Sequence, residues 1–169
     1  MNAPRWRLAT NADQDSILKV IAEARAFLAT QGSGQWQDGH PRPEAIAKDI
    51  ENGRYYVIEV DGMVIGGLAL LDYEPDYEEL LEGHWRQPGA YLVIHRMALG
   101  ASHRGQGYGR FALEQVEAIA RSLRVGSIRV DTHEKNRPMI ALLQKMDYQK
   151  IGVVLLNNFK RRLAFEKIV

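Results

Sequence analysis

YLVIHRMALGASHRGQGYGRFALEQVEAIARSLR, residues 91–124, is the stretch from which the rest of the chain is interpreted. Residues 91–99 are apolar apart from His95 and Arg96, which is typical of a buried strand. From Phe111 to Arg124, apolar residues recur at helical spacing with charged residues between them. The stretch therefore predicts a strand, a glycine-rich turn and a helix, in that order.

The turn RGQGYG, residues 104–109, carries glycine at three alternate positions. Glycine has no Cβ atom, so the backbone can come close to a ligand. The first N–H groups of a helix lack partners within it, and the positive end of its dipole also favours an anion there. The turn thus predicts a cradle for a pyrophosphate, and the alternative is a plain connection between strand and helix.

Composition limits the function classes. A chain of 169 residues, 46% hydrophobic and 25% charged, predicts a single globular domain over residues 1–169. The net charge of +1, from 22 basic and 21 acidic residues, argues against a nucleic-acid partner. Cysteine is absent, and neither a metal-ligand spacing nor an apolar run of membrane-spanning length occurs. We expect a cytoplasmic protein with no metal and no membrane partner.

The remaining segments complete an α/β pattern. Helices are expected around the apolar residues 17–28, over 44–53 after Pro43, and over 138–146. Strands are expected over 5–10, 55–60, 63–71, 127–131, 152–156 and 163–169, the second and third joined by a tight turn at Asp61-Gly62. This order indicates an α/β domain on a mixed sheet.

The glycine turn also resembles a known signature, which is Arg or Gln, two residues, Gly, one residue, then Gly or Ala. Arg104, Gly107 and Gly109 fill it, and Asn136 precedes a short helix, PMIALLQKMDY, as in the same family. The chain is therefore similar to the GCN5-related N-acetyltransferases (GNAT). The resemblance implies a mixed, mostly antiparallel twisted sheet of six to seven strands with about four helices. The sheet is expected to splay between the fourth and fifth strands, 91–99 and 127–131.

The resemblance further implies an acetyl-CoA-dependent N-acetyltransferase acting directly on a primary amine of a small molecule. The pyrophosphate would lie on the backbone amides of 104–110, and the pantetheine would pair with the backbone of 97–99. Asn136 would face the cofactor across the cleft, and a homodimer is common in the family. The implied cofactor-binding residues are Met97, Ala98, Leu99, Arg104, Gly105, Gln106, Gly107, Tyr108, Gly109, Arg110 and Asn136.

His95 is the candidate general base. Strand alternation places residues 91, 93, 95 and 97 on one face, and an imidazole titrates near neutrality. The alternative is a structural histidine. Arg96 points to the other face, where pairing with a carboxylate under the helices is favoured. The family's usual tyrosine acid is replaced by Leu143, which leaves the general acid unassigned.

Two further segments are weighed as acceptor contacts. Trp36 and His40 lie in the loop between the first two helices, where the family often walls the acceptor pocket. A tryptophan that covers the edge of the core is the alternative, and it is favoured. The acidic stretch from Asp72 to Glu82 would attract a cationic amine, but a solvated loop is the favoured interpretation.

Two rival functions stay open. Residues 107–112 formally match G-x-G-x-x-A, and Asp131 follows about 20 residues on, as in dinucleotide-dependent oxidoreductases. Residues 100–106 intervene between strand and glycines, however, and the preceding region is hairpin-like. The other rival is a non-catalytic acyl-CoA-binding module, which the missing tyrosine at Leu143 favours.

Overall fold

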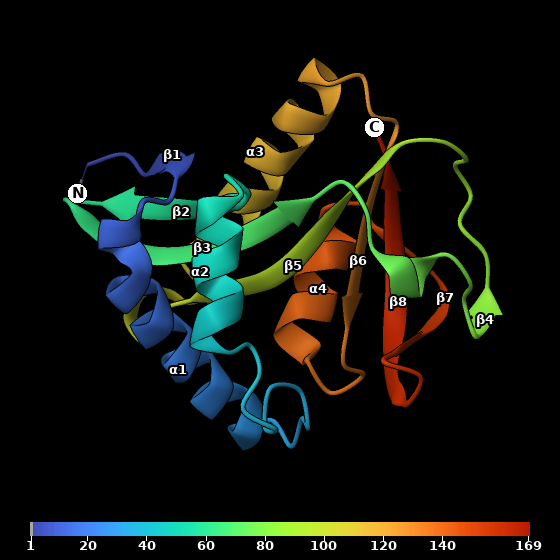
Figure 1. Cartoon of the computed structure of the whole chain (residues 1–169), viewed down its shortest axis with the longest axis horizontal. Helices are drawn as coiled ribbons and strands as arrows, with labels where there is room; N and C mark the ends of the chain where they lie inside the picture. Colours follow the sequence, from blue (N-terminus) through green and yellow to red (C-terminus); the bar gives the residue numbers. More distant parts are fainter. Residues whose placement is uncertain (1) are drawn as a thin grey trace.

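The computed structural model describes residues 2–169 (Figure 1). The strands are β1 (Arg5–Leu8), β2 (Tyr55–Val60), β3 (Met63–Leu71), β4 (Glu82–Gly83), β5 (Tyr91–Leu99), β6 (Ser127–Thr132), β7 (Gln149–Leu156) and β8 (Lys160–Ile168). The α-helices are α1 (Gln14–Thr30), α2 (Pro43–Glu51), α3 (Tyr108–Ser122) and α4 (Arg137–Lys145), and short 3₁₀ turns follow β1, β3 and β5.

These eight strands form one sheet in the order β1-β2-β3-β5-β6-β8-β7-β4. Among the strand pairs of residues 2–169, only β5 and β6 run parallel, and their pairing ends where Ile94 lies opposite Val130. Beyond that point the two strands separate, and β5 continues on β3 as far as Leu99. The predicted α/β fold, with its splay between residues 91–99 and 127–131, is confirmed.

The sheet has eight strands rather than the expected six to seven because β4 joins its edge. This strand contains only Glu82 and Gly83, both exposed, so no alternation of apolar residues could reveal it. It forms because Glu82 and Gly83 pair with Val153 and Gly152 of β7. The pairing is a tertiary contact that the local sequence does not encode.

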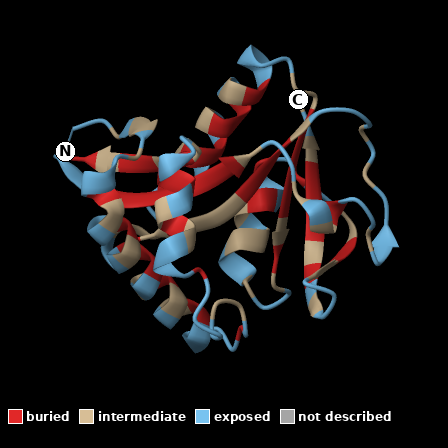
Figure 2. Ribbon diagram, viewed as in Figure 1, coloured by how far each residue is buried: buried red, intermediate tan, exposed pale blue. Residues whose placement is uncertain are grey.

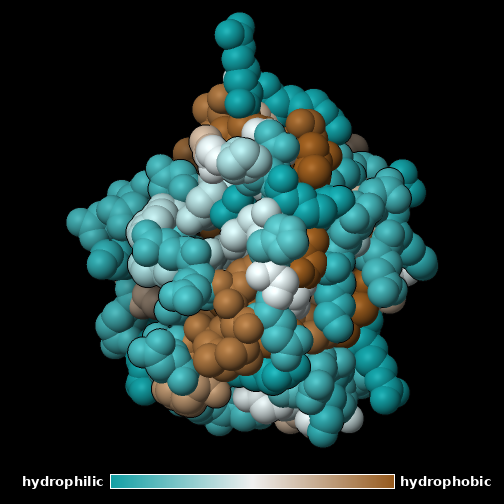
Figure 3. Space-filling view, turned by 90° about the vertical axis from the view of Figure 1, so that its right-hand side faces the viewer, coloured by the Kyte–Doolittle hydropathy of each residue, from teal (hydrophilic) through white to brown (hydrophobic). Residues whose placement is uncertain are grey.

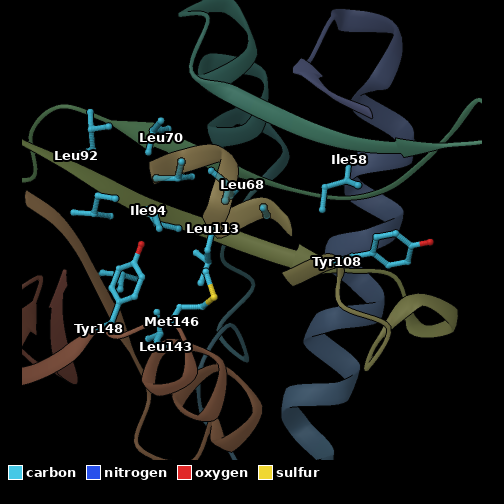
Figure 4. Close-up of a cluster of buried hydrophobic side chains, with 14 of the residues drawn as sticks. Ile58, Leu68, Leu70, Leu92, Ile94, Tyr108, Leu113, Leu143, Met146 and Tyr148 are labelled. Carbon is cyan, nitrogen blue, oxygen red and sulfur yellow. The ribbon is translucent and has the colours of Figure 1, made fainter. Parts of the chain in front are cut away.

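Helices cover both faces of the sheet. On one face, α3 and the end of α4 pack against β2, β3, β5, β6 and β8 in the largest core cluster. Figure 4 shows Leu113 of α3 near the centre of this cluster, with Leu143 and Met146 close to it. On the other face, α1 and α2 pack on β2 and β3. Burial accordingly follows the sheet and the inner sides of the helices (Figure 2).

A bulge in β5 changes which side chains face the site. The register of β5 on β3 shifts between His95 and Ala98, and Arg96 there has a φ of 55°. Met97 consequently packs into the core cluster that contains Ile94. The expectation that Met97 shares a face with His95 is therefore wrong, because one extra residue in a strand reverses the alternation beyond it.

Arg96 pairs with a carboxylate beneath α2, as predicted, but the expectation that it points to the face opposite His95 is wrong. His95 lies opposite Ala69, which packs with α2, so the bulge leaves both side chains on the same face. The Arg96 guanidinium donates to both carboxylate oxygens of Asp49, at 2.6 and 3.0 Å. Asp49 is fully buried and also accepts a hydrogen bond from Arg54 at 2.8 Å. A buried carboxylate needs such partners, so the network ties the bulge in β5 to α2.

The surface is largely hydrophilic. Figure 3 shows the side that carries β4 and β7, where a few hydrophobic patches lie among hydrophilic residues. Exposed large apolar side chains include Leu81 and Phe159. Within residues 2–169, no helix combines the length and the apolar character that crossing a bilayer requires.

One prediction concerns Asp13, which joins β1 to the start of α1. Arg7 donates to both its carboxylate oxygens at 2.8 and 2.9 Å, and the N–H of Thr10 donates at 2.7 Å. These bonds outweigh the effect of burial and lower the pKa of Asp13 to about 2. At pH 7, Asp13→Asn should cost about 2 kcal/mol of unfolding free energy.

Because the folded pKa is depressed, this contribution is present above the unfolded pKa and is lost as the pH falls from about 4 to about 2. Urea denaturation of both proteins at a series of pH values measures it. The exposed Asp15→Asn serves as the matched control. An equal dependence of stability on pH in the Asp13 variant and the unmodified protein would contradict the assignment.

Candidate active site

The larger cavity, about 750 Å³, opens where β5 and β6 separate. Its walls come from the ends of α1 and β5, the glycine turn and α4. Of the described residues, the cationic Arg104, Arg110 and Lys145 line it, and none of its lining residues is acidic. Most of the remaining wall is apolar. A cationic end and an apolar wall suit a ligand with an anionic head and a long uncharged arm.

The glycine turn delivers the start of α3 to this cavity. Gly105 and Gly107 have φ values of 72° and 90°, a region that side chains with a Cβ rarely adopt. The N–H of Phe111 bonds to the carbonyl of Gly107, so the amides of residues 109 and 110 precede the first hydrogen bond of the helix. Helix amides at such an end are donors available to an anion.

Gly109 allows α3 to approach α4. A Cβ atom at Gly109 would lie 2.8 Å from Cδ2 of Leu142, closer than two carbon atoms can pack. Gly109 and Leu142 both line the larger cavity. The three glycines of the turn thus serve two local needs, a left-handed backbone at residues 105 and 107 and a close helix contact at residue 109.

Arg104 links the turn to α1. Its guanidinium donates to the carbonyl of Glu23 at 3.0 Å and lies 4.3 Å from the centroid of the Phe27 ring. These contacts hold its charge at the cavity wall. They also brace the turn against α1, so Arg104 has a structural role besides any contact with a ligand.

Most of the predicted cofactor residues meet at this cavity. Nine of them line it: Met97, Ala98, Leu99, Arg104, Gly105, Gly107, Gly109, Arg110 and Asn136. Gln106 and Tyr108 do not. The Gln106 side chain donates to the carbonyl of Ser102, and the Tyr108 side chain belongs to the core cluster. For Gln106 and Tyr108, contact with the cofactor through the backbone stays a prediction.

A second cavity of about 310 Å³ adjoins the first. It is lined by four carboxylates, from Asp38, Glu74, Asp76 and Asp131, and by the cationic residues Arg96, Lys160 and Arg162. His40 and His95 also line it. The two cavities share lining residues, namely Gln35, Trp36, Met97, Asn136 and Met139. A molecule in the smaller cavity therefore borders on one in the larger.

Gln35 lies at the boundary between the two cavities and lines both of them. Its side-chain oxygen accepts from Thr132 Oγ1 and Asn136 Nδ2 at 3.4 Å each, and from the N–H of His133 at 3.3 Å. Asn136 also caps α4, because its side chain accepts from the N–H of Met139. The loop after α1 is thereby fastened to β6 and α4, a role for Gln35 that nothing in the local sequence indicated.

His95 and Glu74 form a pair at the smaller cavity. His95 Nε2 lies 2.6 Å from Glu74 Oε2, and both side chains are mostly buried. Burial alone would raise the pKa of Glu74, but the hydrogen bond and charge of His95 bring it below its usual value. Glu74 is thus ionised and can only accept, so Nε2 carries the hydrogen and Nδ1 of the neutral ring keeps its lone pair.

The interpretation of residues 72–82 as a solvated loop is wrong for its middle part. Tyr77 is fully buried, Glu74 bonds His95, and Asp76 accepts from the N–H of Asn157 at 3.2 Å. The segment packs on β5, β7 and β8, where Tyr77 joins a core cluster with Val93, Val154 and Ala164. Its run of acidic residues was visible in the sequence, but nothing local indicated that Glu74 reaches a histidine 21 positions later.

Asp131 of β6 and Arg162 of β8 also line the smaller cavity. Asp131 of β6 accepts a hydrogen bond from the Tyr77 hydroxyl at 2.5 Å. Burial raises the pKa of Asp131, although His95, Tyr77 and Arg162 partly offset this effect. Arg162 of β8 is 9% exposed, and burial lowers its pKa. Sequence reasoning did not place either residue in an acceptor site.

The other predicted residues have mixed positions. Trp36 is partly buried against the α1–α2 cluster and lines both cavities, so it covers the core edge and walls the site at once. His40 lines the smaller cavity from an exposed position beside Asp38. Leu143 is fully buried in the core and lines neither cavity. Contact of Trp36 or His40 with a substrate stays a prediction.

Comparisons with known proteins agree with this geometry. The model of the acetyltransferase (GNAT) family matches residues 21–148. A GNAT-family acetyltransferase from Streptococcus agalactiae 2603 is 38% identical, with a TM-score of 0.88 over 98% of this chain and 95% of that one. One from Listeria monocytogenes 4b F2365 is 19% identical, with a TM-score of 0.75 over 98% and 95%.

A third solved structure contains a ligand. It is PaiA N-acetyltransferase from Thermoplasma acidophilum in complex with coenzyme A, 13% identical with a TM-score of 0.76 over 99% of this chain and 100% of that one. At this identity the likeness concerns the fold alone. A comparison with curated proteins found no match.

Proposed function

Since the chain belongs to the GNAT family of acetyltransferases, we propose that it transfers the acetyl group of acetyl-CoA directly to the primary amine of a small molecule. The observation that carries this proposal is the junction of two unlike cavities. The larger has a cationic, amide-lined end, and the smaller holds a paired histidine and carboxylate. Amine and acyl donor would meet where Met97 and Asn136 belong to both walls.

The residues of the larger cavity fit coenzyme A. Amides at the start of α3 and the charges of Arg104, Arg110 and Lys145 suit its phosphates. Within residues 2–169, the β5 backbone beyond Ile94 has no strand partner on the β6 side, so it can pair with an extended polar arm. Acetyl-CoA supplies a thioester whose carbonyl carbon bonds to the amine nitrogen while the carbon–sulfur bond breaks.

The residues of the smaller cavity provide the base. An ammonium has no lone pair, so the amine must lose a proton before attack. Nδ1 of His95 is free of protein hydrogen bonds within residues 2–169, and Glu74 stabilises the imidazolium that forms. A strand N–H among residues 97–99 would polarise the thioester carbonyl. The leaving thiolate has no protein acid at Leu143, which is enclosed in the core.

Both rival functions are weaker. The glycines of 107–112 belong to the GNAT match, which removes the reason for proposing a dinucleotide-dependent oxidoreductase. The absence of a tyrosine acid at Leu143 is compatible with a non-catalytic CoA-binding module. Such a module, however, has no need of a histidine and carboxylate pair beside the acyl site. The pair at 2.6 Å therefore favours an enzyme over a binder.

Ligand binding and turnover test the proposal together. We expect acetyl-CoA at one hundred times its Kd to add about 2.7 kcal/mol to stability, whereas NAD should add nothing. Thiol release with a panel of primary amines should exceed the blank without an acceptor. Stabilisation by acetyl-CoA without any acceptor-dependent thiol would identify a binding module, and the absence of both would reject the CoA site.

A further inference from the structure

Arg162 is a buried cation with no carboxylate partner among the described residues. Its guanidinium makes one hydrogen bond within residues 2–169, from Nη1 to the carbonyl of Arg161 at 2.9 Å, and it forms no ion pair there. The residue is only 9% exposed, yet it lines the smaller cavity. Removing a guanidinium from water is costly unless hydrogen bonds or an anion compensate, so its free donors call for a partner.

The neighbouring charges do not fill that role. Asp131 and Asp38 attract the guanidinium from beyond ion-pair distance, and each has its own partner, Tyr77 and Lys160 respectively. His133 is not a partner for Arg162 either. Its pKa is lowered, first by burial and next by the positive charge of Arg162. The planar set of guanidinium donors is therefore left for a ligand.

The sheet aligns Arg162 with the proposed base. Ala164 of β8 lies opposite Asp131 of β6, and Arg162 is two residues from Ala164, so all three share a face. His95 of β5 follows the last β5–β6 pair on this same face. Neighbouring paired strands are about 4.8 Å apart, and β5 has begun to separate from β6 at His95, so β5 and β8 are at least about 10 Å apart there. A long arginine side chain and a short bifunctional molecule can bridge that distance.

From this arrangement we infer that the acceptor carries a carboxylate close to its amine, as an α-amino acid does, with Arg162 binding the carboxylate while His95 faces the amine. The inference rests on the proposed function and names its substrate class. A guanidinium binds a carboxylate through two parallel hydrogen bonds, which fixes the orientation of the ligand. The cavity volume of about 310 Å³, at the small end of ligand pockets, suits such a molecule.

The test uses matched pairs of acceptors, each α-amino acid and the amine that lacks only its α-carboxylate. Thiol release and calorimetric binding to the CoA-loaded protein are both measured. The unmodified protein should bind and acetylate members with the carboxylate. Arg162→Gln should raise their KM about 10- to 100-fold with a smaller change in kcat, while Arg162→Lys should restore part of the affinity.

The matched control is Arg161→Gln, which removes the same charge from the adjacent, exposed position on the other face of β8 and should change neither value. Unchanged coenzyme A affinity and melting temperature show that Arg162→Gln is folded. Equal use of both members of each pair, or an unchanged KM in Arg162→Gln, overturns the inference but leaves amine acetylation standing. Absence of binding and turnover across the whole panel overturns both.

Discussion

Replacing Gly107 with aspartate should weaken the binding of coenzyme A about 100-fold, equivalent to about 2.7 kcal/mol. Gly107 is the residue before α3, it has a φ of 90°, and no atom of residues 2–169 outside its immediate neighbours lies within 4 Å of the position its Cβ would take. An aspartate there points into open space at the helix end that we assign to the pyrophosphate. Its charge repels the phosphates and competes for the same amides.

The control for this prediction is Gly107→Asn. Asparagine has the same shape without the charge, and it tolerates a left-handed backbone better than most residues. Both variants carry the backbone strain, so their melting temperatures without ligand should be similar. Calorimetric titration with coenzyme A at constant ionic strength should then separate them. If both bind with the same affinity, no phosphate lies at this helix end.

Replacing His95 with alanine should lower kcat about 10²- to 10⁴-fold, the range that general base catalysis contributes, without changing the affinity for coenzyme A. The His95 ring lines only the smaller cavity, so the larger one is unaltered. The loss should be smallest at high pH, where more of the amine is already deprotonated. Rates measured across the pH range with saturating acetyl-CoA give the comparison.

Glu74→Gln and His84→Ala sharpen this test. The Glu74→Gln substitution removes the carboxylate that stabilises the imidazolium, so this variant should show a smaller loss of kcat and a shifted pH–rate profile. His84 is exposed and lines neither cavity, so its replacement should have no effect. A pH–rate profile that is unchanged in His95→Ala would make His95 structural and remove it from the mechanism.

Residue patterns alone predicted the site only where it is built from neighbours in the chain, whereas Trp36, His40 and Asn136 were placed at it through the family resemblance. The glycine turn and the start of α3 are local, and residues 104–110 needed no distant contact to be recognised. The face of β5 was predictable as far as His95. Beyond it the bulge at Arg96, held by Asp49 of α2, reverses the side of Met97. No strand pattern contains that information, because the constraint comes from another element.

The sequence also did not indicate which charged residues become important through their contacts and burial in the fold. Glu74 is one of six acidic residues in its segment, and it differs from them because it meets His95. Arg162 is one of three consecutive basic residues, Lys160 to Arg162, and it differs because the sheet buries it. A charged residue in a sequence gives no indication of whether it is buried or which group it pairs with, because both depend on strands that pair across the fold.

The amino-acid sequence by itself determined the order of helices and strands and the glycine turn that we propose binds phosphate, and the family signature implied the acyl donor. These depend on backbone preferences and periodicities that operate over a few residues. Only the tertiary structure decided where β5 parts from β6, which carboxylate pairs with His95 and that Arg162 is buried beside the smaller cavity. The contacts around that cavity join residues 21 to 122 positions apart, and burial and charge there take their values only after the sheet has formed.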